Sequence, residues 1–237
     1  MTPSDPPRPT PPDVLDALIE VTEAAGRNAL ELGPTGASRK RDGSWVTGAD
    51  KALASFLRTQ LTTLLPEACH LDEENGGEVG QDLSWVVDPI DGTTNFKRGD
   101  DRWCVSVALL SAGRPVLGVV HQPSLQRTWA AGPQGPRFAP DGPGDIGVLI
   151  GGRVPLSGLR WLRLLRQTRG ARSLRMGGSV ALDLVDVALG RAQRAMALGA
   201  SIWDYAAGVV LVEQAGGRVT MWPGGRGVDL LAEAASG

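Results

Sequence analysis

Two helices are expected in the N-terminal part of the chain, and the first has apolar residues at helical spacing. Between Asp13 and Gly33 these residues recur every three to four positions: Val14, Leu15, Leu18, Ile19, Ala25 and Leu32. An aspartate N-cap and a glycine stop frame this segment, so the pattern predicts an amphipathic helix. A second helix is expected over residues 50–65, because the proline at position 66 disfavours helical backbone in the residue before it.

The middle of the chain has the pattern of strands. Residues 83–87 form a short apolar run that ends at an Asp-Pro pair, which indicates a buried strand with a carboxylate at its C-terminal end. Residues 103–110 and 116–121 are also strand-like, and the sequence SAGRP between them favours a hairpin. A third strand is expected at 128–131. An antiparallel sheet portion follows from this arrangement.

The last third alternates between helix and strand patterns. Glycine and proline are dense over residues 132–158, which predicts surface loops around a short strand at 148–150. Helices are expected at 179–189 and 204–215, and strands at 194–198 and 218–222. We therefore expect an α/β (α+β) domain over residues 13–237, with lobes at 13–132 and 133–237, after a disordered lead-in at 1–12.

Composition narrows the class of protein. The 237 residues are 42% hydrophobic and 21% charged with a net charge of -2, so neither general disorder nor a nucleic-acid partner is indicated. The two cysteines, Cys69 and Cys104, lie far apart and suggest neither a disulfide framework nor a cysteine zinc site. No signal peptide and no membrane-spanning run is recognisable. A cytoplasmic protein without membrane contact is expected.

Acidic residues at element boundaries are the candidates for chemistry. They fall in four segments: Asp50, the pair Glu73 and Glu74, the pair Asp88 and Asp91, and Asp204. Mg²⁺ takes oxygen ligands and keeps some waters, so carboxylates that converge at strand and helix ends suit it. Neither histidine lies in these segments, which weakens a zinc or non-haem iron interpretation.

Residues 88–94, DPIDGTT, are the most informative stretch. A stiff turn lets Asp88 and Asp91 face one centre and leaves the Ile90 carbonyl free to act as a ligand. Glycine at position 92 permits close approach of the backbone. The N–H groups of Thr93 and Thr94 could begin a helix whose positive end holds a phosphate. The stretch therefore combines metal and phosphate chemistry.

Each acidic segment also has a plainer explanation. Residues 88–91 could form an Asx-type turn between strands, since Asp-Gly is common in hairpins. Asp204 could be an ordinary first-turn acid favoured by the helix dipole. Glu73 and Glu74 could lie in a solvated loop, and Asp50 could be exposed at a helix start. Spacing alone leaves both explanations open.

Two long motifs resemble signatures of the inositol monophosphatase family. They are WVVDPIDGTTNF at residues 85–96 and WDYAAGVVLVEQAGG at 203–217. Residues 40–50 are similar to the family's substrate-proximal loop, and residues 72–74 resemble its GEE element, so the resemblance spans about residues 13–232. It implies an α-β-α-β-α layered sandwich, usually a homodimer, and a magnesium-dependent phosphomonoesterase that acts on a small phosphorylated metabolite such as inositol 1-phosphate or a sugar or polyol phosphate.

The resemblance also implies roles for individual residues. Glu73, Asp88 and the Ile90 carbonyl would hold a first Mg²⁺, and Asp88, Asp91 and Asp204 a second, with a third, weaker position near Glu73 filled in some members. Hydrolysis would proceed by in-line attack of a metal-activated water on phosphorus.

The remaining implied roles concern the water and the substrate. Thr93, paired with Asp50, would position the attacking water and would form the catalytic set together with Glu73. The backbone of Gly92 and Thr93, beside Ile90 and Thr94, would hold the phosphate, near Asp204. Arg175 matches a family arginine at the active-site wall. These groups define the substrate-binding set: Ile90, Gly92, Thr93, Thr94, Arg175 and Asp204.

Three departures from the family pattern bear on substrate and metal. Asp72 replaces a glycine and adds a charge beside the expected metals. Ala197 replaces a glutamate that contacts substrate hydroxyls, which argues against strict inositol specificity. The short C-terminus leaves room for one terminal strand. Alternative activities are histidinol-phosphate, fructose 1,6-bisphosphate or 3′-phosphoadenosine 5′-phosphate hydrolysis, or metabolite binding without catalysis.

One feature does not depend on the resemblance. Six arginines recur every third residue from Arg160 to Arg175, with no acidic residue between Asp145 and Asp183. The pattern favours an amphipathic helix with a solvated basic face, and steering of anionic substrates or weak polyanion binding is the alternative.

Overall fold

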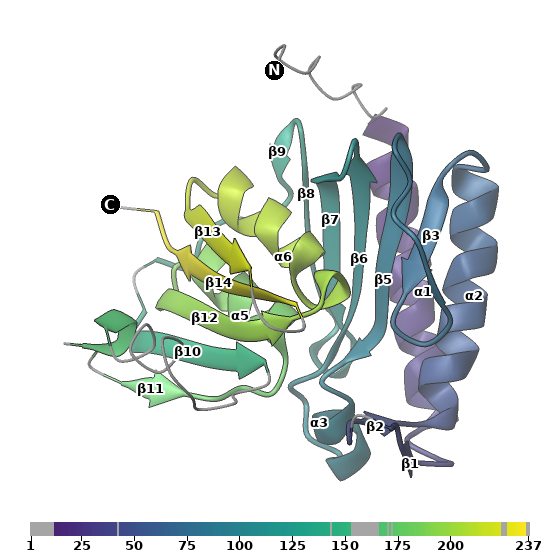
Figure 1. Ribbon diagram of the computed structural model, residues 1–237, viewed down its shortest axis with the longest axis horizontal. Helices are drawn as coiled ribbons and strands as arrows, with labels where there is room; N and C mark the ends of the chain where they lie inside the picture. Colours follow the sequence, from purple (N-terminus) through teal and green to yellow (C-terminus); the bar gives the residue numbers. More distant parts are fainter. Residues whose placement is uncertain are drawn as a thin grey trace.

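The protein is built from stacked layers of helices and sheets (Figure 1). The computed structural model describes residues 12–41, 43–142, 144–152, 166–169, 171, 173–223 and 227–235. Two long helices cover one face of a large sheet, and two further helices lie between that sheet and a smaller one. These helices are α1 (Pro12–Leu32), α2 (Gly48–Leu64), α5 (Val180–Ala188) and α6 (Ile202–Gln214).

The large sheet has seven strands in the order β4-β3-β5-β6-β7-β8-β9. Strands β5 to β9 are antiparallel neighbours, and β3 pairs with β5 in parallel. The hairpin and the third strand predicted from the sequence are confirmed. The strands are β3 (Cys69–Asp72), β4 (Gly76–Gly77), β5 (Leu83–Asp91), β6 (Cys104–Ser111), β7 (Arg114–Gln122), β8 (Arg127–Gly132) and β9 (Gly135–Pro136).

The smaller sheet has five strands in the order β11-β10-β12-β14-β13. It includes the terminal strand for which the sequence left room. The strands are β10 (Ile146–Gly152), β11 (Leu174–Arg175), β12 (Ala192–Ala200), β13 (Arg218–Pro223) and β14 (Val228–Glu233). The remaining elements are the short hairpin β1 (Ser38–Arg39) and β2 (Trp45–Val46), helix α3 (Thr93–Arg98) and a 3₁₀ turn, η1 (Pro123–Leu125).

The large sheet is buried on both faces because its strands alternate between two hydrophobic clusters. On β5, Trp85 and Val87 face the cluster that contains α1 and α2, whereas Val86 faces the cluster that contains α5 and α6. Near-continuous apolar runs in β5 and β6 follow from this double coverage. The predicted layered α/β fold class is confirmed, while the division into two lobes stays a prediction.

Several predicted boundaries require correction. Strand β5 continues to Asp91 instead of ending before Pro89, because a register shift between Asp88 and Asp91 places three steps of β5 opposite two of β6. Proline is tolerated within a sheet at such a bulge. Helix α6 begins at Ile202, so Asp204 is its third residue and not its first. Likewise, α1 begins at Pro12, so Asp13 lies inside the helix instead of capping it.

Parts of two predictions lie outside the described residues. The lead-in at 1–12 is described only at its last position, and Arg160, Arg163 and Arg172 of the arginine row are not described. Within the described part of the chain, no helix is long and apolar enough to cross a membrane.

Candidate active site

Figure 1 shows the end of β5 beside α3 and the β1–β2 hairpin. Residues of these elements line a cavity of 380 Å³. The ends of β10 and the N-termini of α5 and α6 complete its wall. The structure brings together every predicted metal ligand here, with the three residues predicted to hold phosphate. The lining is Gly43, Ser44, Trp45, Glu73, Asp88, Ile90, Asp91, Gly92, Thr93, Thr94, Gly152, Gly178, Val180 and Asp204.

The β5 bulge presents two buried carboxylates. Asp88 accepts a hydrogen bond from the Ile90 N–H at 3.0 Å, so the bulge positions its own first acid. Burial raises the pKa of Asp88 well above its ordinary value, and the charges of Glu73, Asp91 and Asp204 add to this effect. Clustered, desolvated carboxylates are the electrostatic setting in which a divalent cation is stabilising.

Asp91 is held by the N-terminus of α5. Its Oδ2 accepts hydrogen bonds from Ser179 Oγ and from the Ala181 N–H, each at 2.7 Å. Burial, and then the Asp204 carboxylate, raise the pKa of Asp91 to about 8. Ser179 is also the N-cap of α5, so one hydroxyl joins the helix start to the carboxylate. Sequence reasoning did not identify this contact.

Thr93 lies between a carboxylate and a carbonyl. Its Oγ1 is 3.1 Å from Asp50 Oδ1 and 3.1 Å from the Ile90 carbonyl oxygen. Asp50 is buried in a capping box at the start of α2, where its other oxygen accepts a hydrogen bond from the Thr47 N–H at 2.8 Å. Burial raises the pKa of Asp50 although these hydrogen bonds oppose the shift. The exposed position considered for Asp50 is therefore wrong.

Glycine is required at the start of α3. Gly92 is its N-cap with a φ of 91°, and a Cβ at this position would lie 2.9 Å from the Arg102 carbonyl oxygen. A left-handed backbone in this confined space suits glycine alone. The first N–H groups of a helix have no acceptor within the helix. Those of Thr93 and Thr94 are therefore the type of donor that binds an anion.

The acidic turn after β3 carries compensating cations. Lys40 Nζ lies 2.8 Å from Glu73 Oε1 and 2.6 Å from Glu74 Oε1. The charge that Asp72 was expected to add is balanced by an arginine. Arg58 pairs with its Oδ2 at 2.8 Å, and the backbone N–H groups of Glu74 and Asn75 donate to its Oδ1.

Asp204 lines the cavity from the first turn of α6. Its Oδ2 accepts a hydrogen bond from the Ser201 N–H at 2.7 Å as part of a capping box. The plainer explanation, an acid stabilised at a helix N-terminus, therefore applies together with the cavity position. Asp204 therefore caps α6 and also lines the cavity together with the other acids.

The chemistry of the donor set fits Mg²⁺, because carboxylates and the Ile90 carbonyl line a single cavity. Within the described ranges, however, no three Asp, Glu, His or Cys side chains converge closely enough to hold an ion as they stand. Asp91 accepts a hydrogen bond from Ser179 of the α5 N-cap, and Glu73 accepts one from Lys40.

Two predicted specificity residues lie elsewhere. Arg175 is exposed on β11 and is not part of the cavity lining, because β11 is an edge strand of the smaller sheet. Ala197 is buried in the core cluster that contains α5 and α6, and it does not line the cavity either. A glutamate at position 197 would have to be accommodated inside this core.

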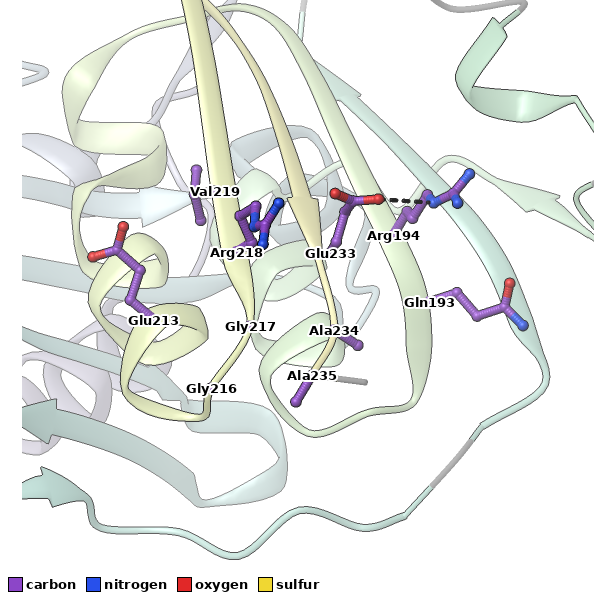
Figure 2. Close-up of a pocket in the computed structure, with 10 residues that line it drawn as sticks. All are labelled: Gln193, Arg194, Glu213, Gly216, Gly217, Arg218, Val219, Glu233, Ala234 and Ala235. Atoms are coloured by element: carbon purple, nitrogen blue, oxygen red, sulfur yellow. Dashed lines mark ion pairs between the residues drawn. The ribbon is translucent and has the colours of Figure 1, made fainter. Parts of the chain in front are cut away.

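A second, larger hollow has a different character. Its volume is 650 Å³, and it lies beside the connection from α6 to β13. Figure 2 shows the ion pair between Arg194 of β12 and Glu233 of β14, whose nitrogen and oxygen are 3.3 Å apart. Arg218 and Glu213 add one further charge of each sign. It shares no lining residue with the acidic cavity. Its lining mixes charges of both signs, so it does not indicate one kind of ligand.

Fold and cavity together define a class: a layered α/β protein whose acidic, glycine-containing cavity suits a divalent cation and a phosphate ester. A model of the inositol monophosphatase family matches residues 13–138 and 159–235. The chain belongs to this family. Membership supports metal-dependent phosphatase chemistry in general, and members generally use Mg²⁺.

Individual relatives agree with this assignment. The chain is 32% identical to an inositol-1-monophosphatase of Mesorhizobium japonicum, across 92% of this chain and 88% of the relative. It is also 32% identical to the Nus factor SuhB of Escherichia coli K12, across 85% and 80%. Among solved structures, extragenic suppressor protein suhB from Bartonella henselae matches with a TM-score of 0.82 and 28% identity, across 94% of both chains. The Thermotoga maritima IMPase matches with 0.78 and 26%, across 93% and 92%.

Proposed function

We propose that this protein is a magnesium-dependent phosphomonoesterase that hydrolyses a small phosphorylated metabolite. The observation that carries the proposal is the joint lining of one cavity by carboxylates, a bulged carbonyl and the N-terminus of α3. Phosphoryl transfer depends mostly on positioning and charge neutralisation, and these groups supply both kinds of interaction. Inositol 1-phosphate and sugar or polyol phosphates are the substrate class tested first.

Glu73, Asp88, Asp91, Asp204 and the Ile90 carbonyl would hold the metal, in two positions with a third near Glu73. When bound, Mg²⁺ supplies positive charge that polarises the phosphate and lowers the pKa of water. The acidic side chains contribute the matching negative charge.

The chain itself orients the attacking water. The Thr93 hydroxyl donates a hydrogen bond to Asp50, with Oγ1 and Oδ1 3.1 Å apart, and this leaves the Thr93 oxygen able to accept a hydrogen bond from a water in the cavity. Thr47 fixes Asp50 from the opposite side, so the acceptor is held in place before substrate arrives. Backbone N–H groups at the start of α3 bind the phosphate oxygens.

The test is phosphate release from a panel of phosphomonoesters, measured with and without Mg²⁺. The panel includes inositol 1-phosphate, fructose 1,6-bisphosphate, histidinol phosphate, 3′-phosphoadenosine 5′-phosphate and p-nitrophenyl phosphate. Magnesium-dependent release from at least one metabolite, lost in Asp88→Asn, is expected. No turnover of any ester at saturating Mg²⁺ would refute the proposal. A homodimer is expected, and light scattering tests it.

A second candidate function rests on the relatives named Nus factor SuhB, which share 32% identity with this chain. The fold would then serve as a binding module in a larger assembly, with or without catalysis. Co-purification of transcription proteins with both the parent chain and an inactive Asp88→Asn variant would support this role. If no such partner co-purifies and the protein has phosphatase activity, the enzymatic function is supported and the binding role is not.

A further inference from the structure

Two cationic side chains from different elements lie against one aromatic ring of the cavity wall. Lys97 Nζ, from α3, is 3.2 Å from the centroid of the Trp45 ring, and Arg39 Cζ, from β1, is 4.8 Å from it. Trp45 pairs with Arg39 in the hairpin register and lines the 380 Å³ cavity. Both positive charges therefore lie one aromatic ring away from the space in which the ester is proposed to bind.

Neither charge is neutralised by an acid. Within the described part of the chain, no carboxylate forms an ion pair with Lys97 or Arg39, although two aspartates follow α3 at positions 100 and 101. Arg39 donates one hydrogen bond, to the Gly43 carbonyl at 3.5 Å. A cation–π contact leaves the N–H donors of an ammonium group free, and it is weaker than a charge-assisted hydrogen bond to a carboxylate or phosphate. Lys97 is therefore held in place but can still bind an anion.

Helix geometry places Lys97 at a defined distance from the phosphate end of α3. Residues four apart share one face of a helix, so Lys97 lies one turn beyond Thr93, whose N–H group is proposed to bind phosphate. Four residues rise about 6 Å along the axis, and helical side chains lean toward the N-terminus. The Lys97 ammonium group is therefore within reach of a substrate group about 6 Å from the bound phosphate.

We propose that Lys97, supported by Arg39 across the Trp45 ring, binds a second anionic group of the substrate. The site then favours phosphomonoesters that carry a further phosphate or a carboxylate about 6 Å from the scissile phosphate. The flat face of Trp45 contributes an apolar wall for the carbon skeleton between the two groups. The inference rests on the proposed function and specifies the substrate class of the same site.

The test compares two esters that differ by one phosphate, inositol 1-phosphate and inositol 1,4-bisphosphate. The parent should have the lower KM for the bisphosphate. In Lys97→Met the ratio of the two KM values should shift about tenfold against the bisphosphate, the size expected for one lost hydrogen bond to a charged group. The shift should appear in KM instead of kcat, because the contact is remote from the reacting phosphorus.

Two further variants and the salt concentration separate charge from packing. Lys97→Arg keeps the charge and should retain most of the preference, whereas Arg98→Met changes the exposed neighbour on α3 and is the matched control that should leave the KM ratio unchanged. The preference of the parent for the bisphosphate should decrease as NaCl is added, because salt screens partly exposed charges. In Lys97→Met the ratio should depend much less on salt.

The outcomes separate this inference from the proposed function. Equal KM values in the parent, or a parental KM ratio in Lys97→Met, overturn the role of Lys97 and leave the phosphatase proposal intact. A lower melting temperature in Lys97→Met with a parental KM ratio would show that Lys97 only joins α3 to the hairpin, which also overturns the inference. If the parent hydrolyses no ester, the proposed function fails. Calorimetric binding of the two inositol esters to the parent and to Lys97→Met then tests Lys97 by itself, and equal affinities of the parent for both esters would overturn its role.

Discussion

Arg102 links the end of the α3 region to helix α5 through two buried acids. Its Nη2 lies 2.7 Å from Asp183 Oδ1 and 2.9 Å from Asp186 Oδ2. The side chains of Asp183 and Asp186 are only 2% and 9% exposed, and that of Arg102 is 31% exposed, so the network is largely shielded from water. Arg102→Met keeps most of the side-chain volume and removes the charge.

The expected loss falls mainly on Asp183. Arg191 Nη1 remains 3.5 Å from Asp186, whereas the Oδ2 of Asp183 already has no hydrogen-bond partner among the described residues. Removing one partner of a buried ion pair typically costs about 3–5 kcal/mol, because the other charge is left uncompensated. The partial exposure of Arg102 favours the lower end, about 3 kcal/mol in the free energy of unfolding.

The loss should depend on pH in a definite direction. Burial raises the pKa of Asp183 to about 6 although Arg102 opposes the shift, whereas the unfolded chain has an aspartate pKa of about 3.9. The folded state therefore binds the proton more readily, and the contribution of Asp183 to stability increases as pH falls from 6 toward 4. Without Arg102 the folded pKa is higher still, so the stability difference between variant and parent should narrow from pH 8 to pH 5.

Urea unfolding followed by circular dichroism, in EDTA at pH 8 and at pH 5, measures both effects. Arg137→Met is the matched control, because Arg137 and Asp16 lie 3.5 Å apart with side chains 48% and 63% exposed. Such surface pairs contribute roughly 0–1 kcal/mol. A loss in Arg102→Met no larger than in the control, or a loss of equal size at both pH values, would refute the reasoning.

Three further substitutions test the cavity. Asp88→Asn should lower turnover by orders of magnitude with unchanged circular dichroism, and it should abolish the rise in melting temperature on adding Mg²⁺; near-parental activity would contradict the metal assignment. Thr93→Ala should lower kcat by roughly 10²- to 10⁴-fold while Mg²⁺ affinity by calorimetry stays close to the parent, because its hydroxyl acts on water. Equal losses in rate and metal affinity would place Thr93 among the ligands. Gly92→Ala should cost about 1–3 kcal/mol in urea unfolding and also reduce activity, because a φ of 91° strains alanine and its Cβ meets the Arg102 carbonyl; a fully stable, active variant would show that the turn relaxes freely.

Local patterns in the sequence determined most of the elements and the identity of the acidic residues. Local sequence patterns located α1, α2, α5 and α6 to within a few residues, since helix and strand signals depend on near neighbours. The motif at residues 85–96 identified Asp88 and Asp91, two of the four carboxylates that line the cavity. The β5 bulge was not predicted, because an Asp-Pro pair by itself indicates the end of a strand. Only the pairing with β6 extends β5 beyond this pair.

Tertiary structure decided which groups meet those acids. Thr93 contacts Asp50 across 43 residues, and Ser179 contacts Asp91 across 88, so both contacts depend on how helices pack against the sheet. The resemblance had suggested the first contact, whereas no sequence pattern predicted the second. Lys40 reached Glu73 for the same non-local reason, and Arg175 lay outside the cavity because β11 pairs at the sheet edge. Residue spacing specifies local backbone geometry, but the partner of a buried charge is set by segments that are distant in sequence and adjacent only after folding.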